Sequence, residues 1–453
     1  ANPWWWAVLR EGRAAPEADY FDVDWDHADG RVIVPVLGDD PDREIASGAL
    51  RIEGDVVRYH DRCFPLRPGT IPDGDVAARL ADQHYRLKHW RDPERNVRRF
   101  FTIDDLVAIR PEHRPVRLAV HRIAAALRAD GLLDGVRIDH VDGLADPASY
   151  LADLRRTLGD DVWLLVEKIV LGDETLPASW PVDGTTGYEW IDLVDHLFTP
   201  PATETTVTAR WSAMSWDARP YHEVEHEAVR EVLAGELAPD LDRLARTVTA
   251  TATGPDGGSP EHEVVCRVLV ELTVALGRYR TYIAAATESE DATRIHGAAG
   301  VARTRLAPVD AAALDTIADL LIAGGEATRR WQQLTGPALA KGGEDRALYR
   351  WLRLGAHNEV GGDPGRWTDG VETFHAFASR TASTRSAPLL AGSTHDTKRS
   401  EDVRARLLAL SERPEQWFAL DDRVRAELGG DADPVARHLA VQTAIGAWPI
   451  DRA

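Results

Sequence analysis

The chain has 453 residues, 44% of them hydrophobic, so it can bury a large core and is long enough for about two to three domains. Its 74 acidic and 53 basic side chains give a formal net charge of -21, which argues against nucleic acid or an anionic membrane as partner. Two cysteines are too few for a disulfide framework and no apolar run is long enough to span a bilayer, so a cytoplasmic location is expected.

The first 75 residues carry strand signals. Residues 31–37 form an apolar run, and residues 49–60 alternate like a hairpin whose turn is Gly54-Asp55. These patterns predict a small β-rich module. The chain starts at Ala1 without Met and without the layout of a signal peptide, so we expect it to be part of a longer protein.

Residues 76–200 alternate between helix and strand patterns. Apolar positions at helical spacing predict a helix over residues 104–129, ended by Gly131 and followed by a strand at 135–138. Asp146 and Pro147 are typical of a helix start, and the predicted helix reaches residue 158 before a second strand at 162–166. Two consecutive strand–helix steps predict parallel strands.

Residues 201–385 show long helical patterns, for example at 262–284 and 310–323, and are interpreted as a mainly helical insertion. The strand pattern resumes at 388–392 and leads to Asp396. The predicted parts are therefore a β-rich module at 1–75, a strand–helix portion at 76–200, the helical insertion at 201–385, and a second strand–helix portion at 386–453.

Three carboxylates stand at or just past the ends of the short apolar runs: Asp139, Glu167 and Asp396. The carboxyl end of a buried parallel strand is where a β/α barrel presents its catalytic side chains. The sequence therefore predicts an α/β fold of the (β/α)8 barrel type and the chemistry of a glycosidase.

The residues around these carboxylates suggest separate roles. Arg137 and Asp139 are two positions apart on a strand, so the guanidinium can bond the carboxylate and keep it ionised as a nucleophile. Glu167 follows an apolar strand, a setting that raises a carboxyl pKa and suits a general acid. A retaining glycosidase holds two such groups about 5 to 5.5 Å apart. Asp396 would bind sugar hydroxyls in the transition state.

Other interpretations of these residues exist. Arg137 and Asp139 could form an ordinary ion pair at a strand end. His395-Asp396 occurs as a metal-binding pair on helices, but here an apolar strand precedes it, so neither metal nor cofactor is predicted. Three large aromatic side chains could pack in the core or stack on sugar rings: Trp180, Tyr188 and Trp190.

Several segments resemble the maltooligosyltrehalose synthases of the α-amylase superfamily. They are GVRIDHVDGLADP at 135–147, VEKI at 166–169, LPASWPVDGTTGY at 176–188 and STHDTKRSED at 393–402, supported by QHYR at 83–86, RRFF at 98–101 and DDL at 104–106. The likeness runs along nearly the whole chain. It implies an α-amylase-type barrel that is incomplete here, with residues 1–75 inserted after an early barrel strand.

The resemblance also implies a function. Asp139 would be the nucleophile, Glu167 the acid/base and Asp396 the stabiliser of the transition state, in an isomerase that converts the reducing-end α-1,4 bond of a maltooligosaccharide to an α,α-1,1 bond. A maltooligosyltrehalose trehalohydrolase would be its functional partner. The substrate-binding residues would be Arg137, His140, Lys168, Tyr188, His395, Lys398 and Arg399. The alternatives are an α-glucan hydrolase of the same superfamily and an inactive carbohydrate-binding fragment.

Overall fold

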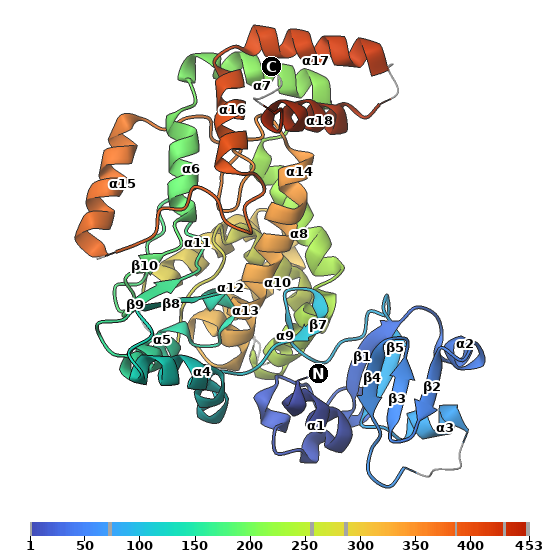
Figure 1. The fold of residues 1–453 in the computed structure, drawn as a ribbon. Coiled ribbons are helices and arrows are strands. Elements are labelled where there is room, and N and C mark those ends of the chain that lie inside the picture. Colours follow the sequence, from blue (N-terminus) through green and yellow to red (C-terminus); the bar gives the residue numbers. More distant parts are fainter. Residues whose placement is uncertain are drawn as a thin grey trace.

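The computed structural model describes residues 2–70, 75–253, 258–284, 289–385, 387–428 and 432–449. A β-rich module that includes α1 (Pro3–Glu11) lies at one end of the molecule, a group of helices forms the middle, and the C-terminal helices lie at the other end (Figure 1). No helix within the described ranges combines the length and the apolar character needed to cross a membrane.

The N-terminal module contains two small sheets. In one, β1 (Val32–Leu37) pairs in parallel with β5 (Tyr85–His89); in the other, β2 (Leu50–Glu53), β3 (Val56–Tyr59) and β4 (Arg62–Pro65) form an antiparallel meander. The predicted strand and hairpin are confirmed, and Gly54 turns the hairpin with a φ of 61°. Two short helices complete the module: α2 (Pro41–Ala46) and α3 (Val76–Ala81).

The segment before the first predicted barrel strand differs from the prediction. β6 (Arg99–Phe100) pairs antiparallel with β7 (Ile103–Val107), and helix α4 runs only from Arg114 to Ala129. The prediction of a helix from residue 104 was therefore wrong for residues 104–113. Pro111 and Pro115 explain the difference, because proline fits the first turn of a helix and breaks its interior.

Three parallel strands carry the predicted catalytic segments. β8 (Gly135–Ile138), β9 (Trp163–Val166) and β10 (Gly184–Thr185) lie side by side in the order β10–β9–β8. α5 (Pro147–Leu158) connects β8 to β9, with the side chain of Asp146 accepting from the backbone of Ser149, and α6 (Tyr188–Leu197) follows β10. The first two strands and the helix between them are confirmed.

The expected strand at 388–392 is not formed as a regular strand. The chain there runs beside β10 instead: the amide of Ala387 donates to the carbonyl of Asp183 at 3.2 Å, and that of Leu389 to Thr185 at 3.1 Å. Gly184 permits this approach, because a Cβ on it would lie 2.4 Å from the Cα of Pro388. Two bonds are too few for a ladder, but they place this segment next to the sheet.

The described parts of residues 201–385 contain helices and no strand. They are α7 (Glu204–Ser215), α8 (Tyr221–Ala234), α9 (Ala238–Thr251), α10 (His262–Ala275), α11 (Glu290–Arg303), α12 (Pro308–Ile322), α13 (Glu326–Leu339), a π-helix (Ala340–Ala347), α14 (Leu348–Arg350) and α15 (Val371–Thr384). The helix predicted at 262–284 ends earlier, at Ala275. Helices α8 to α13 share one apolar core that includes Val232, Leu269 and Trp331.

The C-terminal part is helical in its described residues after the segment beside β10. Its helices are α16 (Glu401–Ser411), α17 (Pro414–Leu428) and α18 (Pro434–Gly446), which lie together with α7 (Figure 1). The division of the chain at residues 75, 200 and 385 remains a prediction.

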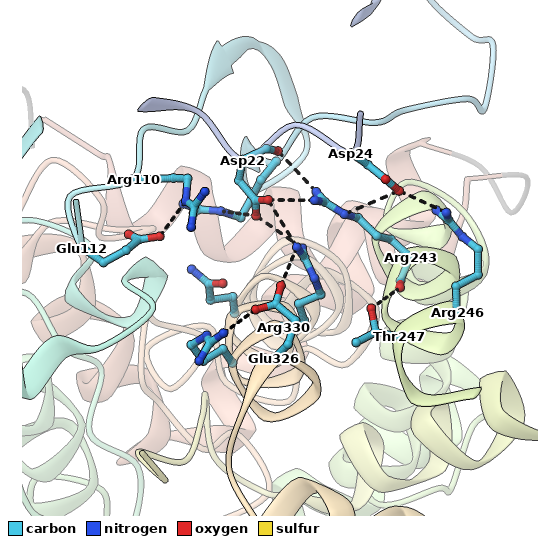
Figure 2. Close-up of polar contacts among 12 residues, drawn as sticks. Asp22, Asp24, Arg110, Glu112, Arg243, Arg246, Thr247, Glu326 and Arg330 are labelled. Atoms are coloured by element: carbon cyan, nitrogen blue, oxygen red, sulfur yellow. Dashed lines mark hydrogen bonds and ion pairs between the residues drawn. The ribbon is translucent and has the colours of Figure 1, made fainter. Parts of the chain in front are cut away.

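A network of ion pairs joins the N-terminal module to the helices (Figure 2). Asp22 accepts from Arg243 of α9 at 2.8 Å and from Arg330 of α13 at 3.3 Å, and the Nε of Arg98 lies 3.4 Å from its carboxylate. Burial raises the pKa of Asp22, but the charges of the three arginines outweigh that effect and hold the pKa well below its usual range. Asp22 therefore stays ionised and anchors the two parts.

Candidate active site

One cavity of about 390 Å³ is lined by side chains from distant parts of the chain. Its wall includes Asp139, Glu167 and Asp396, the three carboxylates singled out in the sequence. Asp139 follows β8 and Glu167 follows β9, so the ends of two neighbouring parallel strands meet there, and the segment beside β10 leads to Asp396. The expected convergence of the three side chains is observed, whereas their catalytic roles remain predictions.

Asp139 is oriented by an arginine on its own strand. Nη2 of Arg137 donates to Oδ1 of Asp139 at 2.9 Å, and Nε of Arg137 donates to the hydroxyl of Thr186 at 3.2 Å. The other oxygen, Oδ2, has no hydrogen bond to any residue of the described ranges, and the Asp139 side chain is 58% exposed. This arrangement leaves one carboxylate oxygen free to attack a bound sugar.

Glu167 is held by the backbone around Asp139. Its amide donates to the carbonyl of Ile138 at 2.7 Å, and the amide of His140 donates to its Oε2 at 2.5 Å. Burial, opposed by the bond from the His140 amide and assisted by the charge of Asp139, raises the pKa of Glu167 to about 7. A carboxyl with this pKa keeps a substantial protonated fraction near neutrality, as a general acid requires.

The His140 amide reaches Glu167 because its backbone has the left-handed conformation, with φ 47° and ψ 49°. Gly143 makes room for this turn, since a Cβ on Gly143 would lie 2.4 Å from the His140 ring. The ring of His140 packs against Phe100 and Phe101 at centroid distances of 5.1 and 4.6 Å. Burial lowers the pKa of His140. The neutral ring therefore serves as part of the cavity wall.

Asp396 is placed by its own turn and by α6. Its amide donates to the hydroxyl of Thr394 at 3.2 Å, and the hydroxyl of Tyr188 donates to its Oδ2 at 3.4 Å. Nε2 of His395 lies 3.0 Å from the same oxygen. Among the described residues, no group of three or more His, Cys, Asp or Glu side chains is arranged to hold a metal ion.

Glu359 supports the segment that carries Asp396. This side chain is buried at 2% exposure, and its two oxygens accept from the backbone amides of Lys398 at 2.5 Å and Arg399 at 3.0 Å. Charge-assisted bonds from one buried carboxylate to two consecutive amides fix a turn firmly. Neither the motif analysis nor residue spacing pointed to Glu359.

The expected substrate-binding residues separate into two groups. His140, Lys168, His395 and Lys398 line the cavity. The ammonium of Lys168 is engaged inside the wall, however, at 3.0 Å from Glu174 and 3.4 Å from Asp142, with its side chain 1% exposed. The ion pairs show that Lys168 supports the cavity wall, and its contact with substrate stays a prediction.

Arg137, Tyr188 and Arg399 are absent from the cavity wall of the described chain. Arg137 bonds Asp139, Tyr188 bonds Asp396, and the guanidinium of Arg399 donates to the carbonyl of Asn358 at 3.2 Å. Direct contact of these three residues with substrate stays a prediction. Trp180 is buried in the core beside Tyr282, which favours the core interpretation, whereas Trp190 is half-buried and packs against Phe374 of α15.

Several cavity residues were missed as candidates. Phe100 and Phe101 come from β6 and its turn, and the π-helix contributes Lys341 and Glu344, with Nζ of Lys341 5.2 Å from the Phe101 ring. The RRFF segment was noted only as part of the family resemblance. Lys341 and Glu344 lie in a helical stretch with no chemical motif, so spacing alone gave no signal for them.

Comparison with known proteins tests the expected resemblance of this chain to the maltooligosyltrehalose synthases. No family model matches the chain. A protein of Mycobacterium tuberculosis assigned as a maltooligosyl trehalose synthase is 38% identical over 99% of this chain. The solved maltooligosyltrehalose synthase of Arthrobacter ramosus superposes with a TM-score of 0.90 at 38% identity over 100% of the chain. The resemblance to maltooligosyltrehalose synthases is confirmed.

A more distant structure shares the same arrangement. The crystal structure of a hypothetical maltooligosyl trehalose synthase from Sulfolobus tokodaii has a TM-score of 0.81 at 27% identity and matches 99% of this chain. The chain spans 56% of the length of the mycobacterial relative and 57% of the two solved structures. The similarity to the synthases therefore holds for nearly all of this chain and for somewhat more than half of each relative.

Proposed function

We propose that this protein, at its full natural length, converts the reducing-end α-1,4 bond of a maltooligosaccharide into an α,α-1,1 bond, which leaves a trehalose unit at that end. The observation that carries the proposal is the pairing of Asp139, oriented by Arg137, with Glu167, whose pKa is raised to about 7, in one cavity at neighbouring strand ends. An α-amylase-type (β/α)8 barrel is the fold we propose around β8, β9 and β10.

In the first step, Oδ2 of Asp139 attacks the anomeric carbon of the penultimate glucose unit while Glu167 gives its proton to the glycosidic oxygen. The carbon–oxygen bond breaks, a glycosyl ester forms on Asp139, and the terminal glucose is freed. Asp396, held by Thr394 and Tyr188, hydrogen-bonds the sugar hydroxyls as positive charge develops on the ring.

In the second step, the freed glucose turns so that its anomeric hydroxyl faces the ester. Glu167, now a carboxylate, takes the hydroxyl proton, the hydroxyl oxygen attacks the ester carbon, and the Asp139 carboxylate leaves. Two displacements at the same carbon keep the α configuration. Water has to be kept from the ester, and four apolar side chains of the cavity wall serve this purpose: Phe100, Phe101, Ile103 and Val360.

Incubation with maltopentaose tests the proposal through the number of reducing ends. Each isomerisation removes one reducing end, whereas each hydrolysis adds one, so a falling count together with an α,α-1,1 linkage in the NMR spectrum supports the synthase. A rising count would identify the glucan hydrolase. One observation favours that alternative: the side chains of Asp139 and Asp396 are 58% and 48% exposed in this chain, which leaves both open to water. An unchanged count with measurable binding would identify a carbohydrate-binding protein.

The chemistry of the product suggests the surrounding pathway. A glucan that ends in trehalose is the substrate that a maltooligosyltrehalose trehalohydrolase would cleave next, so we propose that enzyme as the functional partner. Cytoplasmic residence is proposed with it. Neither step of the proposed reaction requires a cofactor, since the carboxyl groups of the chain supply the nucleophile and the proton.

A further inference from the structure

Glu344 is a further carboxyl in the wall of the same cavity, and the mechanism above does not use it. It lies within the π-helix Ala340–Ala347, a conformation that is rare and frequently occurs at functional sites. The π-helix packs directly on α8, because a Cβ on Gly342 would lie 2.6 Å from the Cα of Val229. The backbone that carries Glu344 is therefore fixed in place.

The two oxygens of Glu344 have different surroundings. The hydroxyl of Tyr279, another cavity residue, donates to Oε1. Oε2 has no hydrogen bond or ion pair with any residue in the part of the chain that the structure describes. The nearby ammonium of Lys398 bonds Asp345 at 3.0 Å instead of Glu344. One oxygen of a cavity carboxyl thus stays available to a ligand.

The charges facing Glu344 come from several elements. Asp345 lies on the π-helix and Glu167 follows β9. Lys398 lies two residues after Asp396, and Glu359 accepts from the Lys398 amide. Burial, opposed by the charge of Lys398 and assisted by the three carboxylates, raises the pKa of Glu344 to about 8. The carboxyl is therefore mostly protonated at neutral pH, and the bond from Tyr279 to Oε1 leaves the proton on Oε2.

Building on the proposed function, we propose that Glu344 binds the glucose unit on the leaving side of the cleaved bond and holds it while it turns. Glu167, the proposed acid that protonates the leaving oxygen, lines the same cavity as Glu344, so a glucose unit released beside Glu167 stays in the cavity that Glu344 faces. A neutral carboxyl both donates and accepts hydrogen bonds. It can therefore hold a hydroxyl in either orientation of the sugar.

The binding test uses the Asp139→Asn protein at full natural length, so that maltopentaose binds without turnover. By calorimetry at pH 7, Glu344→Gln should bind within about 3-fold of this parent because the amide also donates and accepts, whereas Glu344→Leu should bind about 10-fold more weakly. Glu225→Leu is the matched control, since Glu225 is a buried α8 carboxyl, with its pKa also raised to about 7, outside the cavity wall. Equal affinities for parent and Glu344→Leu would overturn the proposal.

Measuring the affinity for maltopentaose over a range of pH separates binding by Glu344 from a merely structural role of this residue. The measurement does not need the Glu344→Leu protein, so it also works if that variant does not fold. Affinity of the parent should fall above about pH 8 as Glu344 loses its proton, and the Glu344→Gln protein should lack that part of the fall. Identical pH dependences in the two proteins would refute the role. These readouts do not depend on product identity, so a hydrolytic wild type would contradict the proposed function and leave the binding result interpretable.

Discussion

At the scale of single residues, Asp139 has the most specific expected role. Asp139→Asn keeps the size of the side chain, but an amide cannot form the glycosyl ester. We expect turnover of maltopentaose to fall at least about 1000-fold, equivalent to about 4 kcal/mol in the barrier, with an unchanged thermal unfolding midpoint. A stopped assay of reducing ends measures this. If the folded variant kept more than a thousandth of wild-type activity, Asp139 would not be the nucleophile.

Glu167 makes a prediction about pH. The acid must be protonated and its pKa is about 7, so kcat/KM for maltopentaose should decline as pH rises above about 7. Glu167→Gln should slow maltopentaose about 1000-fold and α-glucosyl fluoride far less, because fluoride leaves without a proton. Fluoride release measures the second substrate. Equal losses on both substrates would remove Glu167 from the role of acid.

The sequence revealed the three carboxylates proposed as catalytic because each follows a short apolar run, and the ends of neighbouring parallel strands converge whatever their distance along the chain. It did not reveal Glu344 or Phe101. These side chains enter the cavity from a π-helix and a short strand turn, and only the packing of the helices on the sheet places them there. Nor did the sequence reveal the partners within the protein that Lys168 and Arg399 bond: Glu174 and Asp142 for Lys168, and the carbonyl of Asn358 for Arg399.

At the scale of elements, Glu359 makes a prediction for the turn that carries Asp396. Glu359→Gln replaces one of the two accepting oxygens with a donor that faces a backbone amide, so the turn should shift. A displacement of about 1 Å costs on the order of 100-fold in turnover, and we expect a loss of that size in kcat with a smaller change in maltopentaose affinity. Glu412→Gln, at an exposed site after α16, should leave both unchanged. Wild-type kcat in Glu359→Gln would show that the turn is held by other contacts.

The elements themselves were predicted best where local signals agreed. Strands β8 and β9 and helix α5 have apolar runs, an N-cap at Asp146 and a proline at the first helical position, and all three are confirmed. Residues 104–113 have helical spacing of apolar side chains yet form β7 and a loop, because pairing with β6 and two prolines outweigh that pattern. The segment at 388–392 has strand residues but makes only two bonds to its neighbour.

At the scale of the whole molecule, the association of the N-terminal module with the helices depends on the charge network around Asp22 (Figure 2). This matters for the cavity, because Phe100 and Phe101 lie two and three residues after Arg98, and the Phe101 ring faces Lys341 of the π-helix. Arg98, Arg243 and Arg330 are 16 to 18% exposed and converge on one carboxylate. Without that charge, three arginines would remain close together and largely removed from water.

Asp22→Asn should therefore lower the free energy of unfolding by about 3 kcal/mol at pH 7, measured by urea denaturation. The folded-state pKa of Asp22 is depressed, so its contribution is present above the unfolded pKa of about 4 and is lost as pH falls below that value. The difference between wild type and variant should shrink accordingly at pH 3. Asp26→Asn, with its side chain 90% exposed beside Arg13, is the matched control and should change stability little at either pH. A difference that stayed constant from pH 7 to pH 3 would show that Asp22 stabilises the fold through packing and not through its charge.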